Sequence, residues 1–223
     1  MQSVKLVAIT KPTTNMGDGT AEGAIAYMAR VSNPTNQDST EGVDKLIRYL
    51  VRNEHWSPFE MISVVMEIKT TRDISRQILR HRSFSFQEFS QRYAVVQEFV
   101  VDREARLQDQ KNRQNSIELN TQNGDHSKLQ GTWVNKQQEI LNKASEIYDW
   151  AIDNGIAKEQ ARAILPEGLT VSTLYMSGNL RSWIHYCQLR MSNGTQKEHT
   201  QIAKECWEVI GHNFPNVIKA LEQ

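Results

Sequence analysis

The chain has 223 residues, of which 39% are hydrophobic and 23% charged, a composition typical of soluble globular proteins and unlike that of disordered or fibrous ones. Its 26 basic and 26 acidic residues cancel, so the broad positive field of non-specific nucleic-acid binders is missing and we expect no nucleic-acid partner. No apolar window reaches the ~18 residues of a membrane span and the first residues do not resemble a signal peptide, so we expect a cytoplasmic protein without a membrane partner.

The amino-terminal segment predicts a strand, a loop and a helix. Residues 4–10 are rich in β-formers, residues 11–19 in turn formers, and residues 21–31 are Ala-rich and amphipathic. Gly17, Gly19 and Gly23 invite comparison with a dinucleotide-binding loop, but their spacing, G-x-G-x-x-x-G, and their distance from the strand do not match that fingerprint. We therefore expect Thr20 to cap the helix and Gly23 to be merely tolerated within it.

The next elements lead into an arginine-rich segment. A helical stripe of apolar residues predicts a helix over 43–51, and a β-branched run predicts a buried strand over 62–68. The segment Thr70-Thr71-Arg72-Asp73 resembles a capping box, so the strand is expected to pass directly into a helix. Arg72, Arg76 and Arg80 recur every four residues on one face of that helix.

The second half of the chain predicts mainly helices. Residues 103–131 are Gln-, Asn- and Asp-rich without an apolar period, which indicates a long loop or a partly ordered lid. Helical spacing returns over 133–150, continues over 156–164 up to Pro166, and recurs over 180–189, while residues 170–176 are strand-like. The final helix is expected over 202–210, before Asn213-Phe214-Pro215. The order lacks regular alternation, so we predict an α+β fold: one domain over residues 1–223, with a mixed or antiparallel sheet flanked by long helices.

The segment from Arg80 to Tyr93, R-H-R-S-F-S-F-Q-E-F-S-Q-R-Y, concentrates residues that suit a phosphorylated ligand. Arginine holds phosphate oxygens through a planar pair of donors, and the hydroxyls and aromatic side chains between the arginines would anchor them beside apolar surface. A solvated basic face with surface ion pairs is the plainer alternative.

Two cysteines, Cys187 and Cys206, are too few and too far apart for a zinc site, a redox pair or a disulfide framework. We expect both to be small buried hydrophobic residues, and we expect no metal.

Four segments, in the same order along the chain, resemble the family of flavin-dependent thymidylate synthases. The family signature is R-H-R followed after seven residues by Ser, and here Arg80-His81-Arg82 is followed by Ser90, with Glu88, Arg92 and Tyr93 fitting the extended pattern. The segments H-W-S-P-F-E at 55–60, A-R-A-I-L-P at 161–166 and N-L-R-S-W-I-H-Y-C-Q-L-R at 179–190 agree as well. Two departures bear on flavin affinity: Ser83 and Gln87 stand where the family often has an aliphatic residue and Asn.

The resemblance implies that the enzyme methylates deoxyuridine monophosphate (dUMP), with 5,10-methylenetetrahydrofolate as carbon donor, reduced FAD as hydride donor and NADPH regenerating the flavin. It also implies a homotetramer with active sites built from several chains. The dUMP site would use Gln77, Arg80, Glu88, Ser90, Gln91, Arg92, Arg162 and Arg190. The FAD site would use His55, Ser57, Arg80, His81, Arg82, Glu88, Asn179, Arg181 and His185.

Arg190 is the expected catalytic residue, because a guanidinium can stabilise the charge that builds on uracil as its carbon 5 becomes nucleophilic. Alternatively, it only complements the dipole at the end of a helix. His55 and His81 titrate in a range that suits acid-base catalysis or hydrogen-bonded structural roles, and we expect them to bind flavin. No cysteine stands in an activated context, so no enzyme nucleophile is expected.

Two other functions remain open at this point. A nucleotide- or RNA-binding module could use the same arginines and phenylalanines, although the chain lacks the basic surface of such modules. A flavoprotein reductase without methyl transfer is the other, and the presence of Gln77, Arg162 and Arg190 argues against it.

Overall fold

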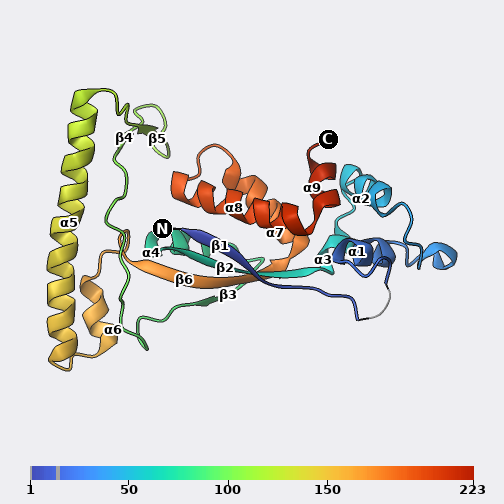
Figure 1. Cartoon of the computed structure of the whole chain (residues 1–223), viewed down its shortest axis with the longest axis horizontal. Helices are drawn as coiled ribbons and strands as arrows, with labels where there is room; N and C mark the ends of the chain where they lie inside the picture. Colours follow the sequence, from blue (N-terminus) through green and yellow to red (C-terminus); the bar gives the residue numbers. More distant parts are fainter. Residues whose placement is uncertain (1, 14–15) are drawn as a thin grey trace.

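An antiparallel sheet lies at the centre of the computed structural model, which describes residues 2–13 and 16–223. Its four strands follow the order β1-β2-β6-β3 (Figure 1). They span Ser3–Ile9 (β1), Ser63–Thr71 (β2), Ser85–Glu88 (β3) and Val171–Asn179 (β6). β2 and β6 pair along their whole lengths, and alternate residues of β2 such as Met66 and Ile68 are buried. The predicted strands at 4–10, 62–68 and 170–176 are confirmed.

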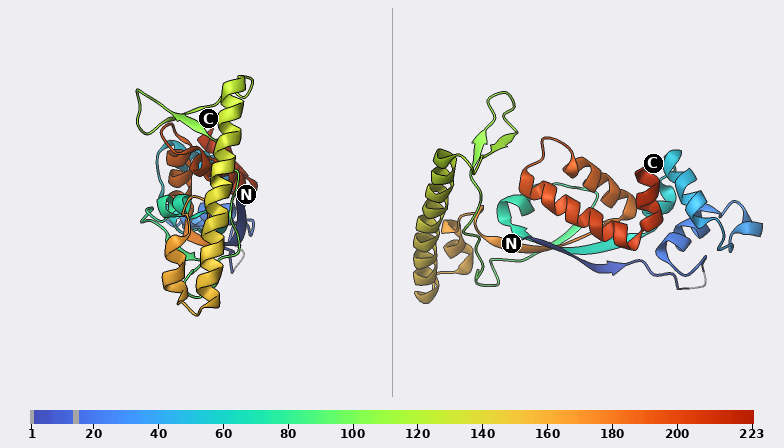
Figure 2. Two further views of the ribbon diagram at one scale, coloured as in Figure 1. Left: turned by 90° about the vertical axis from the view of Figure 1, so that its left-hand side faces the viewer. Right: turned by 45° about the horizontal axis from the view of Figure 1, so that its top comes forward.

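Helices cover one face of this sheet, and further helices stand at its two ends (Figures 1 and 2). Those on the face are α4 (Arg72–Ile78), α7 (Leu180–Met191) and α8 (Lys197–Asn213), followed by α9 (Pro215–Leu221). One end carries α1 (Ala21–Ala29), the turn η1 (Pro34–Asn36), α2 (Val43–Arg52) and α3 (Ser57–Glu60). The other carries the hairpin β4 (Arg106–Gln108) and β5 (Ser116–Glu118), α5 (Gly124–Asp153), α6 (Lys158–Ala161) and η2 (Arg162–Ile164). The predicted α+β class with an antiparallel sheet and long helices is confirmed.

The main core lies between the sheet and α7 and α8. Trp183 and Tyr186 of α7 and Ile202 and Cys206 of α8 are fully buried there, together with Cys187. The prediction that both cysteines are buried is confirmed. Among the residues described, no helix is long and apolar enough to cross a membrane.

The prediction of a long loop over 103–131 is wrong for part of the segment. The segment forms the β4–β5 hairpin and the first turns of α5, whose amino end is capped by the Asn123 side chain. Polar contacts fasten it: Gln137 of α5 is buried, donates from Nε2 to the Arg103 carbonyl (2.8 Å) and accepts from the Arg103 backbone N–H (3.0 Å). A segment held in this way needs no apolar period, which is why its order could not be seen in the composition.

Three local predictions also need correction. Thr71 precedes α4 but makes no capping bond, because its hydroxyl is bonded to the Asp73 carboxylate and to Arg103. Arg80 lies beyond the end of α4, so it does not continue a helical stripe with Arg72 and Arg76. The helix at 202–210 is not the last one, because Pro215 starts α9.

Gly23 is required rather than merely tolerated. Thr20 caps α1 as predicted, accepting from the Gly23 backbone N–H at 3.0 Å. A Cβ at Gly23 would lie 2.1 Å from Oδ1 of Asp18 and 2.9 Å from its backbone nitrogen, so only glycine fits there. The predicted loop 11–19 contains residues 14 and 15, which lie outside the described part.

Candidate functional site

The R-H-R segment forms the turn between α4 and β3. Arg80 and Arg82 are exposed, whereas His81 is half-buried. Phe84 holds the turn in place: its ring lies 4.9 Å from that of Trp183 and 6.0 Å from that of Tyr186, centroid to centroid. The expectation that aromatic residues anchor this segment therefore holds for Phe84, but Tyr93 is 80% exposed.

His81 orients Arg190, which stands near the end of α7. The guanidinium donates from Nε to Nε2 of His81 at 2.8 Å. Burial, together with the nearby charge of Arg190, lowers the pKa of His81 to about 4, so the imidazole is neutral near pH 7 and accepts this bond. Within the described residues, no hydrogen bond engages the two terminal nitrogens of Arg190. This arrangement offers a fixed cation with two donors to a ligand.

Glu88, at the end of β3, is held by residues that sequence reasoning missed. Its Oε1 accepts from the hydroxyls of Ser75 (2.6 Å) and Ser172 (2.8 Å), and Nη1 of Arg72 lies 3.9 Å away. These groups come from α4 and β6, so the sheet and the helix together fix the carboxylate. Only Arg72 carried a signal in the sequence, as a member of the arginine series.

The residues after Glu88 lie toward α6. Arg92 donates from Nε to Oε2 of Glu159 at 3.2 Å, and both side chains are about half exposed. Arg162 begins η2, directly after α6. Gln91 is 4% exposed, and its Nε2 is the one buried side-chain nitrogen or oxygen in the described part that has no hydrogen-bond partner. An unpaired buried donor is costly, so this amide is available to a ligand.

A cleft of about 560 Å³ contains two of the residues predicted to bind flavin, Arg181 and His185. It is lined by Trp56, Glu60, Ser83, Arg181, His185 and Gln188, among others. Arg181 forms an ion pair with Glu60, and Asn179 caps α7 by accepting from the Ser182 backbone N–H at 2.8 Å. Three further predicted flavin ligands are exposed and adjacent in sequence to lining residues: His55 and Ser57 flank Trp56, and Arg82 precedes Ser83. An aromatic wall with cationic and hydroxyl donors suits an aromatic phosphorylated ligand.

The predicted residues thus fall into three groups within one chain. The first contains Gln77, His81 and Arg190 between α4 and α7, the second lines the cleft around Arg181, and the third contains Ser90, Gln91, Arg92 and Arg162 near α6. Glu88 lies between the first and third groups. Across the described residues, no hydrogen bond or ion pair joins Arg92 or Arg162 to Arg190.

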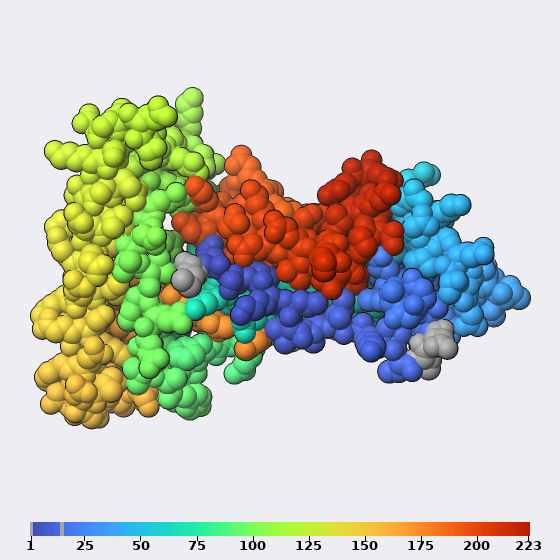
Figure 3. All heavy atoms as spheres, in the orientation of Figure 1, coloured from blue at the N-terminus to red at the C-terminus, as the bar shows by residue number. Residues whose placement is uncertain are grey.

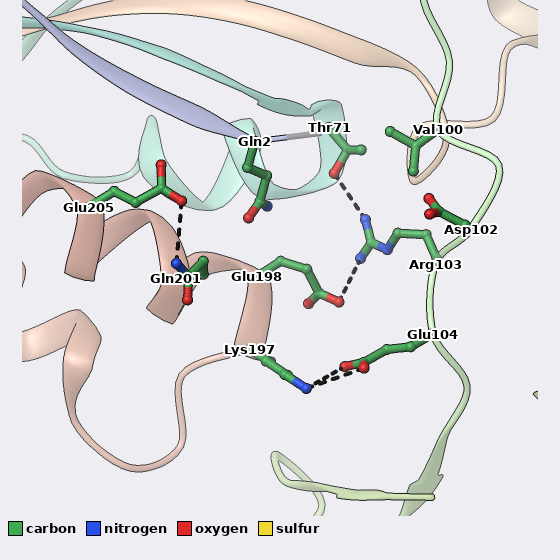
Figure 4. Close-up of a pocket in the computed structure, with 10 residues that line it drawn as sticks. All are labelled: Gln2, Thr71, Val100, Asp102, Arg103, Glu104, Lys197, Glu198, Gln201 and Glu205. Carbon is green, nitrogen blue, oxygen red and sulfur yellow. Dashed lines mark hydrogen bonds and ion pairs between the residues drawn. The ribbon is translucent and has the colours of Figure 1, made fainter. Parts of the chain in front are cut away.

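Another pocket, between α8 and the strand-like segment before the hairpin, contains none of the predicted residues (Figure 4). Its cationic groups have partners within the pocket: Arg103 points at Thr71 and Glu198, and Lys197 points at Glu104. It lies in the notch between the hairpin end of the molecule and α8 (Figure 3). Because its arginine and lysine are engaged by neighbouring side chains, we assign it a structural role.

The two thiols are poor nucleophiles. Both are fully buried, and burial raises the pKa of each above its ordinary value.

Comparison with known proteins gives a consistent result. Residues 15–216 match the family model described as thymidylate synthase complementing protein. The chain is 48% identical over 220 residues to the probable flavin-dependent thymidylate synthase of Paramecium bursaria Chlorella virus 1, with 99% of each chain covered. It is 47% identical over 223 residues to the flavin-dependent thymidylate synthase of Synechocystis sp., covering 98% of this chain and 99% of the relative.

A solved structure agrees with these matches. The crystal structure of the UMP/dUMP methylase PolB from Streptomyces cacaoi, bound with 5-Br dUMP, is similar with a TM-score of 0.81 at 27% identity. The likeness covers 100% of this chain and 95% of that one.

Proposed function

The chain belongs to the family of flavin-dependent thymidylate synthases, and on that premise we propose that it converts dUMP to thymidylate with 5,10-methylenetetrahydrofolate as carbon donor. We infer that the flavin is FAD and that NADPH reduces it, with residues 1–223 acting as one domain. When bound, the reduced flavin supplies the hydride that completes the methyl group.

The pair formed by His81 and Arg190 is the observation that carries this proposal. Uracil attacks through carbon 5 only as negative charge builds on the ring, and a fixed guanidinium stabilises that charge as it develops. His81 engages Nε of Arg190 at 2.8 Å and leaves the terminal nitrogens for the nucleotide. Because His81 stays neutral, it orients Arg190 without adding a second positive charge, and the guanidinium is the cation of this pair. Arg190 is therefore the proposed catalytic residue.

The nucleotide would be held by the residues around this pair. Arg80, Arg92 and Arg162 are the proposed phosphate ligands, because forked donors match phosphate oxygens. Gln91 has an unpaired buried amide donor that an oxygen of the nucleotide would satisfy. The remaining proposed dUMP contacts are Gln77, Glu88 and Ser90.

The donor set of the cleft fits a flavin dinucleotide. Trp56 offers an aromatic wall, and Arg181 and His185 offer donors for a pyrophosphate. We propose that FAD contacts these cleft residues together with His55, Ser57, Arg80, His81, Arg82, Glu88 and Asn179. The chain's own contribution is to orient the flavin against the nucleotide and to exclude water.

Assembly into a homotetramer is the proposed oligomeric state. Two observations support it. The proposed nucleotide ligands Arg92 and Arg162 lie near α6, and within the described residues no hydrogen bond or ion pair joins them to Arg190, which is consistent with a site that a second chain completes. In addition, α5 carries an exposed apolar stripe of Leu129, Trp133, Ile140, Ile147 and Trp150.

The flavin itself provides a direct test. Purified holoenzyme should be yellow, should bleach with NADPH under anaerobic conditions, and should form thymidylate only when methylenetetrahydrofolate is present. A colourless protein that FAD cannot reconstitute contradicts the proposal. Bleaching without thymidylate formation would identify a reductase instead.

A further inference from the structure

His199, in the first turn of α8, links the core of the protein to the proposed nucleotide site. It is fully buried, yet both of its ring nitrogens are bonded. Nε2 lies 3.1 Å from the Tyr186 hydroxyl, and Nδ1 lies 3.3 Å from Oε1 of Gln77. Gln77 in turn donates from Nε2 to Oε1 of Gln196 at 2.7 Å. Four side chains from α4, α7 and the start of α8 thus form one chain of hydrogen bonds.

The Tyr186 hydroxyl sets the direction of this chain. Tyr186 is fully buried, and His199 is its one hydrogen-bond partner in the part of the chain that the structure describes. If His199 carried its proton on Nε2, the buried tyrosine hydrogen would have no acceptor, which is unfavourable. Tyr186 therefore donates to Nε2, and His199 carries its proton on Nδ1 and donates to Gln77.

We propose that His199 is a positioning residue for the nucleotide: its Nδ1–H holds the carbonyl of Gln77 and so turns the Gln77 amide nitrogen outward as a donor. The amide nitrogen has two hydrogens, and Gln196 accepts one of them. The other would meet an acceptor oxygen of the nucleotide, on uracil or phosphate. This inference rests on the proposed function, in which Gln77 contacts dUMP.

The surroundings keep His199 in the state that this role requires. Burial, with the charge of Arg190 and the proximity of His81, lowers the pKa of His199 to about 3. A protonated His199 would donate from both nitrogens and would leave the Tyr186 hydroxyl without its acceptor. Near neutral pH the imidazole therefore stays neutral and its single proton stays on the side of Gln77.

Two substitutions separate positioning from simple packing. In His199→Asn the amide nitrogen stands near the place of Nδ1, so it can still donate to Gln77. In His199→Gln the amide reaches the place of Nε2, so it can contact Tyr186 but not Gln77. Both remove the same ring from the core, and a purely structural role predicts equal effects.

The test measures dUMP affinity and the KM for dUMP of holoenzyme, with flavin content and thermal stability as controls for folding. We expect His199→Gln to weaken dUMP binding and raise KM by roughly three- to tenfold, the equivalent of one hydrogen bond, with kcat at saturating dUMP nearly unchanged. His199→Asn should bind dUMP within roughly twofold of the parent protein. Equal losses in the two variants, or normal affinity in folded His199→Gln, would overturn the proposal.

The tautomer can be read independently of any nucleotide. Solid-state ¹⁵N NMR of histidine-labelled holoenzyme, with His199→Asn identifying the signal, should find Nδ1 protonated and Nε2 unprotonated. Tyr186→Phe should release this preference. The opposite tautomer in the parent protein would overturn the inference, whereas a parent protein that does not bind dUMP at all would instead overturn the proposed function.

Discussion

His81 and His199 are two neutral imidazoles beside one guanidinium. Their ring centroids lie 6.3 Å apart, and burial and Arg190 lower the pKa of each, to about 4 and about 3. A neutral imidazole has a nitrogen that can accept a hydrogen bond, whereas a protonated one does not. His81 can therefore orient Arg190 without a carboxylate that would neutralise the guanidinium. His81 and His199 thus leave the positive charge of Arg190 available for the proposed chemistry.

These shifts predict how stability depends on pH. The unfolded chain protonates these histidines as pH falls below about 6.5, but the folded chain does so only near the lowered values, so acidification favours unfolding. The free energy of unfolding should fall by about 1.4 kcal/mol per pH unit for each histidine in this window and level off below the folded pKa values.

Urea denaturation near pH 7 and near pH 5.5 measures this slope, in a range where ordinary carboxylates stay ionised. His199→Asn should reduce the slope by removing one of the two groups. Stability that is constant or rises on acidification would show that the histidines are not held neutral.

Gly178 of β6 is predicted to be irreplaceable. A Cβ there would lie 2.4 Å from Cδ1 of Phe84, the side chain that anchors the R-H-R turn. Gly178→Ala should therefore displace Phe84 and destabilise the protein by about 1–3 kcal/mol, as overpacked cores are destabilised. Gly131→Ala in α5 is the matched control: its Cβ would meet nothing within 4 Å, and it should be neutral or slightly stabilising. Equal thermal stability of the two variants would contradict this account.

At the level of elements, the segment 103–131 marks the limit of sequence-based prediction. Apolar residues recur at regular spacing in β1, β2, β6 and most of the helices, so these elements could be predicted from the local sequence. The hairpin and the start of α5 are held by polar pairs between distant residues, such as Arg106 with Glu198 at 2.7 Å. The contact between His199 and Gln77 is of the same kind, and no local pattern marks it. Residues in a family motif could be named, but the partners that orient them could not.

Arg103 makes several of the polar contacts that hold this segment. It bonds Thr71, Asp73 and the Gly168 carbonyl, and its side chain is 16% exposed. Arg103→Met should leave the Asp73 carboxylate and the Gly168 carbonyl without this partner and destabilise the protein by about 2 kcal/mol, less than a fully buried pair would.

Hydrogen exchange provides the measurement, with faster exchange expected across residues 99–118. Lys136→Met is the control, because the pair of Lys136 with Glu139 is more than 60% exposed on both sides and contributes below about 1 kcal/mol. Unchanged exchange in Arg103→Met would mean that the hairpin is held by other contacts.

The whole molecule is elongated, with α5 crossing the end of the sheet far from α1–α3 (Figures 1 and 2). One side of α5 packs on the chain through Leu141, Ala144 and Tyr148. A neighbouring side exposes the apolar stripe, in which Ile140 is 54% and Trp150 59% exposed. Such a surface is typical of an interface between proteins.

If α5 contributes to the proposed tetramer, a charge on the stripe should disrupt it. Ile140→Glu is expected to shift the assembly toward smaller species, as measured by light scattering after size exclusion, and to lower thymidylate formation in parallel. Gln138→Glu adds a charge to an exposed position on another side of α5 and should leave the assembly intact. Normal assembly of Ile140→Glu would exclude the stripe from the interface.

Release of tritium from carbon 5 of labelled dUMP tests the central claim most directly, because it reports attack by the uracil itself. With flavin, NADPH and methylenetetrahydrofolate, the parent protein should release tritium, and Cys187→Ala with Cys206→Ala should still release it because no thiol takes part. Arg190→Ala should keep its flavin and lose release by about 10²–10³-fold, the typical effect of removing a group that stabilises developing charge. Near-normal release from Arg190→Ala, or loss of release in the cysteine variant with its fold and flavin intact, would contradict the account.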